Sequence, residues 1–198
     1  MQWILASASP RRKQLFAEIV ESFDVLPAKG EENVPEGFTP EQTVRHLAWQ
    51  KAEEISRLPQ AQGKAVLGAD TVVALGANIL GKPKDEADAV AMLTALSGNT
   101  HQVYTGICIF YPTENGKYGV YTFSDCTKVQ FNPLSKQQID AYVASGSPMD
   151  KAGAYGIQDG GLVQEIEGSF SNVVGLPVEL LKREIQNIER ENKAAGMR

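Results

Sequence analysis

Two hydroxyls and two guanidiniums gather between Ser7 and Arg12, at a predicted turn from a strand into a helix. Ser9 is a favourable N-cap residue and Pro10 suits the first helical position, so the helix is expected to begin here. Backbone N–H groups at a helix N-terminus attract anions, and one arginine can bind two phosphate oxygens at once. Ser7, Ser9, Arg11 and Arg12 are therefore candidate ligands of a polyphosphate. The structural alternative is a capped helix whose arginines are solvated.

Asp70 stands within the otherwise apolar segment Leu67–Val73, which is predicted to be part of a strand. A carboxylate is rare in such a strand and costly to bury without a partner. The position is explained if Asp70 binds a cation, takes a proton from water, or pairs with a basic side chain. A local hydrogen bond to Thr71 is the structural alternative.

The remaining charged candidates carry little signal one at a time. Lys82 follows a predicted hairpin that returns the chain towards Asp70, Glu31 and Glu32 lie in a polar loop, and Lys51 lies in the middle of a predicted helix. Each of them alone is typical of a solvated surface. As a set, anion-binding cations combined with carboxylates are the groups needed for metal-assisted attack on a phosphate.

A glycine-rich segment from Asp150 to Gln158 is the last candidate. Gly153 and Gly156 permit a close approach of the backbone to a ligand, and the Gln158 amide offers both a donor and an acceptor to the edge of a base. The alternative is a glycine-rich turn that leads into the next strand. Residues 168–177 are interpreted as structural, as a tight turn that opens the last helix.

Composition and charge narrow the class of protein. The net charge of −5 over 198 residues, with no basic run longer than Arg11–Lys13, argues against a nucleic acid polymer as partner but allows a small anion. No segment is long and apolar enough to span a membrane, so we expect a cytoplasmic protein. Cys108 and Cys126 are expected to be buried reduced thiols. His46 and His101 lack metal-ligand spacing, and no Gly-x-Ser-x-Gly or Walker-type loop is present.

The periodicity of apolar residues predicts the elements that must position these side chains. The pattern is that of an α/β protein with a mixed sheet, without a linker between independent domains. Expected strands cover residues 3–6, 23–26, 65–75, 102–111, 118–131 and 162–166, and expected helices begin near residues 10, 40, 85, 135 and 177. A turn is expected at Pro112–Lys117, and a polar tail is expected to fray from about Arg190.

Taken in order, the motifs resemble those of the Maf family of nucleotide pyrophosphatases. The resemblance spans residues 4 to about 185 and includes Ser7–Arg12, Glu32, Lys51-Ala52, Gly68–Thr71, Gly81-Lys82-Pro83, Thr105-Gly106, Asp150–Gln158 and Ser169–Pro177. It implies one domain over residues 1–198, with an elongated mixed β-sheet flanked by helices and two lobes around a central cleft. The fold would be related to that of the inosine triphosphate pyrophosphatases.

The resemblance also implies roles for individual residues in the hydrolysis of a nucleoside triphosphate to its monophosphate and pyrophosphate. Asp70 matches the family's catalytic acidic residue, and Mg²⁺ or Mn²⁺ would be held by Asp70 and Glu32. Which of Glu31 and Glu32 faces the metal is left open. The substrate-binding residues implied are Ser7, Ser9, Arg11, Arg12, Lys51, Thr71, Lys82, Lys151 and Gln158.

Three positions resemble the members of the family that act on dTTP and UTP: Arg11, Thr71 and Gln158. Relatives that act on 7-methyl-GTP usually carry an aromatic residue, Gln and Glu at these places. Two alternatives stay open, namely a pyrophosphatase acting on 7-methyl-GTP or ITP, and a nucleotide-binding regulator of cell division. A homodimer is expected from the family alone.

Overall fold

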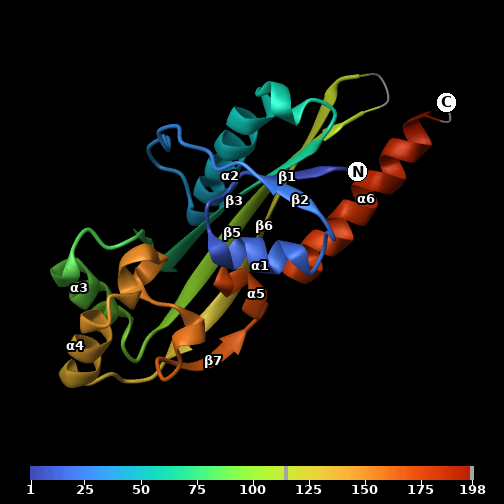
Figure 1. The fold of residues 1–198 in the computed structure, drawn as a ribbon. Helices are drawn as coiled ribbons and strands as arrows, with labels where there is room; N and C mark the ends of the chain where they lie inside the picture. Colours follow the sequence, from blue (N-terminus) through green and yellow to red (C-terminus); the bar gives the residue numbers. More distant parts are fainter. Residues whose placement is uncertain (114–115, 197–198) are drawn as a thin grey trace. The chain divides into compact units, whose positions relative to one another are not determined.

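The computed structural model describes residues 1–113 and 116–196, and its elements alternate between strands and helices along most of the chain (Figure 1). The strands are β1 (Trp3–Leu5), β2 (Phe23–Val25), β3 (Ala65–Leu75), β4 (Asn78–Leu80), β5 (Thr100–Pro112), β6 (Tyr118–Phe131) and β7 (Val163–Glu167). The α-helices are α1 (Pro10–Ala17), α2 (Pro40–Ser56), α3 (Glu86–Leu96), α4 (Lys136–Ala144), α5 (Phe170–Val174) and α6 (Val178–Gly196). The predicted strands and the starts of the predicted helices are confirmed to within a few residues.

The strands form one mixed sheet in the order β2-β1-β3-β5-β6-β7, with β4 paired to β3. Strand β1 runs parallel to both β2 and β3, with Leu5 opposite Val25 and Leu67. The β3–β4 and β6–β7 pairs are antiparallel. The mixed α/β architecture predicted from the sequence is therefore confirmed.

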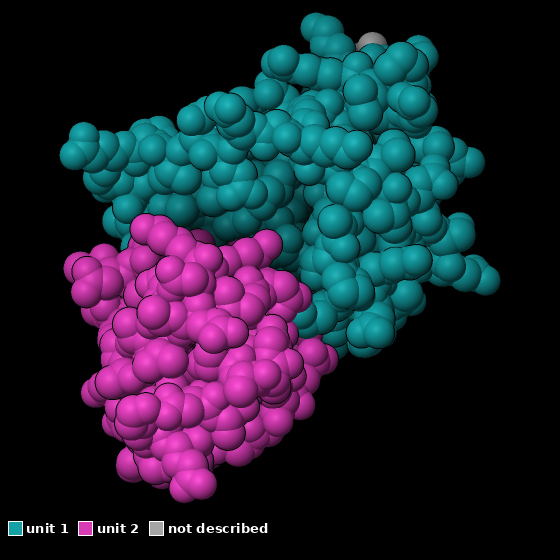
Figure 2. Space-filling model, turned by 60° about the vertical axis from the view of Figure 1, so that its left-hand side comes forward, with its two compact units in different colours: residues 1–70, 105–125, 175–198 teal, residues 71–104, 126–174 magenta. Residues whose placement is uncertain are grey.

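The chain divides into two compact units (Figure 2). Unit 1 comprises Met1–Asp70, Thr105–Asp125 and Gly175–Arg198, and unit 2 comprises Thr71–Tyr104 and Cys126–Val174. The central cleft that the family resemblance implies stays a prediction.

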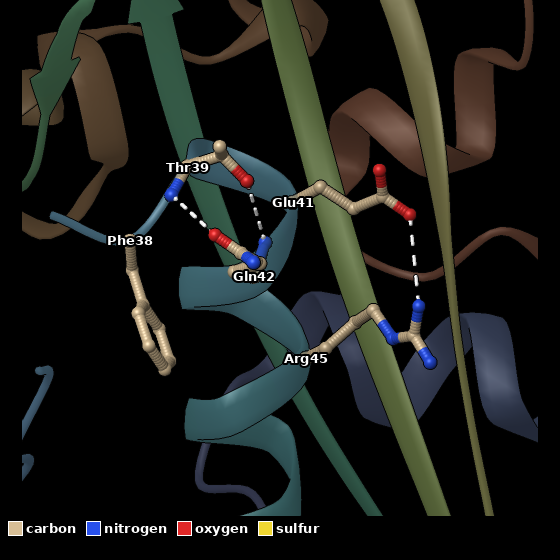
Figure 3. Close-up of a pocket in the computed structure, with 5 residues that line it drawn as sticks. All are labelled: Phe38, Thr39, Glu41, Gln42 and Arg45. Carbon is tan, nitrogen blue, oxygen red and sulfur yellow. Dashed lines mark hydrogen bonds and ion pairs between the residues drawn. The ribbon is translucent and has the colours of Figure 1, made fainter.

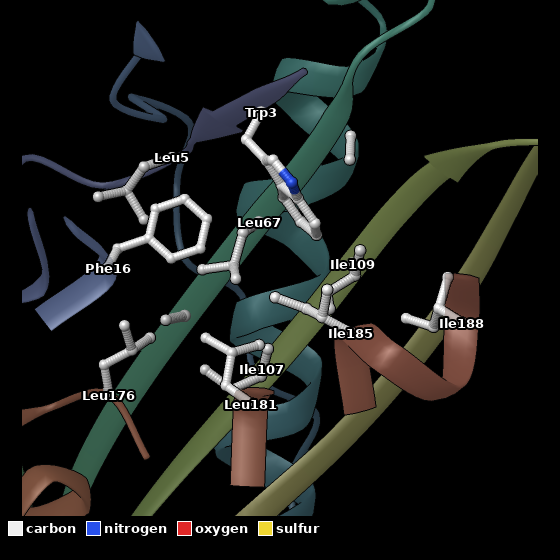
Figure 4. Packing of buried hydrophobic residues seen from close by; sticks show 12 residues of the cluster. Trp3, Leu5, Phe16, Leu67, Ile107, Ile109, Leu176, Leu181, Ile185 and Ile188 are labelled. Carbon is white, nitrogen blue, oxygen red and sulfur yellow. The ribbon is translucent and has the colours of Figure 1, made fainter. Parts of the chain in front are cut away.

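Unit 1 has a hydrophobic cluster on each face of its strands. Trp3 and Leu5 pack with Phe16 of α1 and with Leu181 of α6 (Figure 4), whereas Ile4 belongs to the other cluster, with residues of α2. Alternate residues of a strand point to opposite faces, so the three-residue strand β1 serves both clusters. Helix α2 is thus on the opposite face from α1 and α6.

Unit 2 has its own core, built by α3, α4 and the adjoining parts of β5 and β6. Leu93, Val103, Phe131, Ile139 and Tyr155 are among its buried members. Asn172 of α5 is also buried, and its amide donates to the Val103 carbonyl and to Thr127 Oγ1, both at 3.0 Å. The sequence predicts a tight turn over residues 168–177, whereas the structure contains the short helix α5 within them.

Two predictions about side chains and helix ends are wrong. Helix α6 continues to Gly196 instead of fraying from about Arg190, and Asn192 Nδ2 donates to the Pro112 carbonyl at 3.0 Å. Cys126 is exposed, in contrast to the buried Cys108, because its neighbour Thr127 points into the protein and successive strand residues alternate.

Parts of two predictions fall on residues 114–115 and 197–198, which lie outside the described residues. They are the centre of the expected Pro112–Lys117 turn and the end of the expected tail. At the edge of the first gap, the Thr113 amide donates to the Lys117 carbonyl at 2.8 Å. Among the described residues, no helix is long and apolar enough to cross a membrane.

Candidate active site

Helix α2 lies directly on two strands of unit 1 because glycines leave room for its backbone. A Cβ added to Gly68 of β3 would lie 2.2 Å from the Ala48 carbonyl oxygen and 2.8 Å from the Ala52 amide nitrogen. A Cβ added to Gly106 of β5 would lie 2.3 Å from the Val44 carbonyl. Since no side chain separates the helix from the sheet at these two points, the height of α2 above the sheet is set by backbone contact.

The close packing of α2 on the sheet brings Lys51 of α2 into contact with Asp70 of β3. Asp70 is two residues after Gly68 and therefore points to the same face of the strand, the face that α2 covers. Lys51 Nζ lies 2.5 Å from Asp70 Oδ1 and 2.8 Å from Glu32 Oε1. One ammonium thus contacts two carboxylates from different parts of unit 1, and Glu32, not Glu31, makes the second contact.

The exposure of the three charged groups differs in a way that matters for chemistry. The side chain of Asp70 is 12% exposed and that of Lys51 is 18% exposed, whereas that of Glu32 is 54% exposed. Burial raises the pKa of Asp70, and the positive charges of Lys51 and Arg12 oppose that rise. The result is a raised pKa for a carboxylate that still has a cation in direct contact, a combination typical of catalytic carboxylates.

The N-terminus of α1 holds Arg12 in place through Ser7 and Ser9. The Ser9 side chain caps the helix by accepting the Arg12 amide at 3.4 Å, and the buried Ser7 hydroxyl accepts the Ser9 amide at 3.2 Å and Arg12 Nη1 at 3.4 Å. Arg12 Nε donates to the Gly175 carbonyl at 3.0 Å. The predicted cap at Ser9 is confirmed, whereas the partner 163 residues away could not be seen in the sequence.

Arg12 also belongs to the electrostatics of Asp70. Burial lowers the pKa of the Arg12 guanidinium, and the negative charges of Asp70 and Glu32 counteract the shift. An arginine remains charged in any such site, because its ordinary pKa is so high. Unit 1 therefore combines Ser7, Ser9, Arg12, Lys51, Asp70 and Glu32, and the predicted ligand Arg11 is half-buried next to Arg12.

Four predicted substrate-binding residues belong to unit 2: Thr71, Lys82, Lys151 and Gln158. Thr71 is half-buried, and Lys82 and Gln158 are exposed. Lys151 Nζ donates to the Ser147 carbonyl at 2.5 Å, to Ser147 Oγ at 3.0 Å and to Asp150 Oδ1 at 2.8 Å. These contacts use the three donors of an ammonium within its own loop, so they favour a role in shaping that loop. Substrate binding by the four residues stays a prediction.

A cavity of about 430 Å³ lies at the N-terminus of α2 (Figure 3). It is lined by Phe38, Thr39, Glu41, Gln42 and Arg45. Thr39 and Gln42 are engaged in a capping box, and Arg45 pairs with Glu41 at 3.8 Å. Glu41 also accepts from Ser124 Oγ at 2.9 Å and Arg45 donates to the Thr122 carbonyl at 3.2 Å, and none of the predicted site residues lines the cavity.

Comparison with solved structures defines the class of fold. The chain aligns with the Ham1 protein of Staphylococcus aureus over 94% of this chain and 99% of that chain, with a TM-score of 0.51. It aligns with a HAM1 protein from Coxiella burnetii over the same shares of the two chains, with a TM-score of 0.54. Both are 17% identical to this chain, so they establish the fold alone.

Comparison of sequences then identifies the family. The family model described as Maf-like protein matches residues 2–188, and the chain belongs to the Maf family. A relative from Agathobacter rectalis is 46% identical over 200 residues, covering 94% of this chain and 97% of the relative. One from Aquifex aeolicus is 46% identical over 190 residues, covering 95% and 96%. Both relatives are named dTTP/UTP pyrophosphatase, and the family predicted from the motifs is confirmed.

Proposed function

We propose that this protein hydrolyses dTTP and UTP between the α- and β-phosphates, giving the nucleoside monophosphate and pyrophosphate. The observation that carries the proposal is the buried Asp70 carboxylate, in contact with Lys51 and within the electrostatic field of Arg12. A general base with a raised pKa beside fixed cations suits attack by water on a polyanion. The names of the relatives support the same reaction and the same two substrates.

In the proposed reaction, the Asp70 carboxylate orients a water and accepts its proton as the oxygen attacks the α-phosphorus. The bond from the α-phosphorus to the bridging oxygen breaks, and the electron pair leaves with pyrophosphate. Arg12 and Lys51 neutralise the charge that builds up on the phosphate oxygens. Lys51 also favours the ionised form of Asp70, which burial alone would disfavour.

The residues of unit 1 fit a divalent metal. Asp70 and Glu32 both contact the same ammonium, at 2.5 and 2.8 Å, so the two carboxylates converge on one position of positive charge. Mg²⁺ is usually held by one or two carboxylates together with substrate phosphates and waters, and Mn²⁺ also suits oxygen ligands. The described residues contain no group of three or more His, Cys, Asp or Glu side chains able to hold a metal, so phosphate oxygens and waters would complete the shell. A divalent ion bound there would stabilise the negative charge on the phosphate oxygens and polarise the phosphate for attack.

We assign recognition of the pyrimidine nucleobase of the substrate to Arg11, Thr71 and Gln158, and this assignment rests on the family resemblance. The phosphate contacts of Lys82 and Lys151 rest on the same ground. A cytoplasmic location and a homodimer likewise stay predictions.

The test compares the native protein with Asp70→Asn, using dTTP and UTP with Mn²⁺ and separate assays for pyrophosphate and phosphate. Loss of one stabilising contact costs about 2.7–4 kcal/mol in transition-state energy, which is about 100- to 1,000-fold in rate, so removal of the base should lower turnover by at least about 100-fold. Asp24→Asn makes the same chemical change at an exposed ion pair with Lys64 and should leave turnover unchanged. Near-native turnover by Asp70→Asn would refute the assignment.

The product and the substrate panel separate the alternatives. Release of phosphate and a diphosphate would mean that the wrong bond has been proposed. Faster turnover of ITP or 7-methyl-GTP would favour a purine substrate, and tight binding without turnover would favour a regulator.

A further inference from the structure

The loop that carries Glu32 is attached to α2 by side chains that the proposed chemistry does not use. Glu54 of α2 accepts the backbone N–H of Lys29 through Oε1 and that of Gly30 through Oε2, both at 2.9 Å. Gln50 of α2 donates through Nε2 to the Asn33 carbonyl at 3.0 Å. The loop is therefore bound on both sides of Glu32.

The helix spacing explains why these contacts converge on Glu32. Gln50, Lys51 and Glu54 are separated by one and three residues, and Gln50 and Glu54 are one turn apart, so all three project from the same side of α2. Lys51 contacts the Glu32 carboxylate, while the other two contact the backbone before and after it. One helix side thus binds the side chain and the two flanks of a single loop residue.

The chemistry of the contacts requires a carboxylate at position 54. Two neighbouring N–H groups are accepted by two oxygens of one charged group, an arrangement stronger than two neutral hydrogen bonds. Gly30 fits closely against it, because an added Cβ would lie 2.8 Å from Glu54 Oε2. Lys29, Gly30 and Glu32 are themselves exposed, so the packing of their own side chains contributes little to holding the loop.

We propose that Glu54, assisted by Gln50, is a positioning residue that holds Glu32 where it can share a divalent metal with Asp70. The inference rests on the proposed function, since it concerns the metal that this function needs. Glu54 contacts the loop backbone and acts on the metal only through Glu32. Outer partners of metal ligands commonly change metal affinity by about 10- to 100-fold when they are replaced.

The experiment measures Mn²⁺ binding to the nucleotide-free protein by the electron paramagnetic resonance signal of free Mn²⁺. Glu54→Gln places an N–H group against a backbone N–H and should weaken binding by about tenfold or more. Glu53→Gln removes the same charge from the adjacent residue, which pairs with Arg57 instead, and should leave binding within about twofold. Amide exchange of the segment around residues 29–33 should become faster in Glu54→Gln only.

Turnover at increasing Mn²⁺ adds a readout that general damage to the fold would not produce. The Mn²⁺ concentration for half-maximal rate should rise in Glu54→Gln, and kcat at saturating Mn²⁺ should recover to within a few-fold of native. If Glu54→Gln does not fold, Gly30→Ala disturbs the same contact from the loop side and should show the same shifts.

The inference is overturned if Glu54→Gln loosens the loop but binds Mn²⁺ as the native protein does. It is also overturned if Glu53→Gln weakens binding equally, because the effect is then one of net charge. Failure of the native protein to release pyrophosphate is a different result, since it refutes the proposed function itself.

Discussion

Gly68→Ala tests whether the contact between α2 and β3 determines the geometry of the site. The added Cβ would lie 2.2 Å from the Ala48 carbonyl oxygen, and ordinary van der Waals contact begins at 3.4 Å, so about 1.2 Å of separation must be gained. The obstructing atoms include backbone, which cannot rotate away as a side chain can. Helix α2 must therefore move away from β3 or tilt.

The structure sets the size of the two expected effects. Overfilling a well-packed contact costs about 1–3 kcal/mol of unfolding free energy, and we expect the upper part of that range because backbone must move. Ala52 also lies against Gly68, and Lys51 is its neighbour in the helix. When α2 moves, the 2.5 Å contact between Lys51 and Asp70 should therefore lengthen. A displacement of about 1 Å in a catalytic geometry can lower the rate about 100-fold.

The assays are urea unfolding for stability and steady-state turnover of dTTP at saturating Mn²⁺ for activity. Gly106→Ala is the matched control, because its Cβ would lie 2.3 Å from the backbone of Val44, seven residues before Lys51. It should destabilise to a similar extent and reduce turnover much less. Native stability and native turnover in Gly68→Ala would refute the reasoning, and equal losses of turnover in both variants would refute the link to Lys51.

Two further predictions concern the buried histidine His101 and the half-buried arginine Arg12. Burial lowers the pKa of His101 from 6.5 to about 4. As the pH falls, the unfolded chain therefore binds a proton at this histidine before the folded protein does, and folding becomes less favourable. At ~1.36 kcal/mol per pKa unit, the free energy of unfolding should fall by about 3 kcal/mol between pH 6.5 and pH 4. His101→Gln should remove this part of the pH dependence in urea unfolding, and an unchanged slope would contradict the prediction. Arg12→Lys keeps the charge but loses the guanidinium bonds to the Gly175 carbonyl and Ser7 Oγ, so kcat/KM for dTTP should fall about 10- to 100-fold. Steady-state kinetics that match those of the native protein would show that charge alone suffices there.

Local chemistry made most of the fold readable from the sequence. The Ser9-Pro10 and Thr39-Pro40 pairs predicted the starts of α1 and α2, and the structure has a capping side chain at each. The apolar run from Ala65 to Leu75 predicted β3 and made Asp70 conspicuous. Each of these signals involves residues within a few positions of one another, where propensity and capping act.

The order of the motifs predicted the Maf family and most of the candidate site residues, but it did not predict how they contact one another. Lys51 in the middle of a helix has no local signal, and Glu31 and Glu32 could not be told apart. The sequence left Glu54 unnoticed and predicted only a structural turn at Gly175, although Glu54 holds the loop of Glu32 and the Gly175 carbonyl accepts from Arg12.

The sequence by itself determined most of the elements that form, although not the short helix α5, and which residue types are available for phosphate chemistry. Only the tertiary structure decided that Lys51 meets Asp70 and Glu32, because these residues come from a helix, a strand and a loop. They meet where the backbone of α2 rests on Gly68. The height of a helix above a sheet depends on packing between distant segments, and local sequence patterns carry no measure of it.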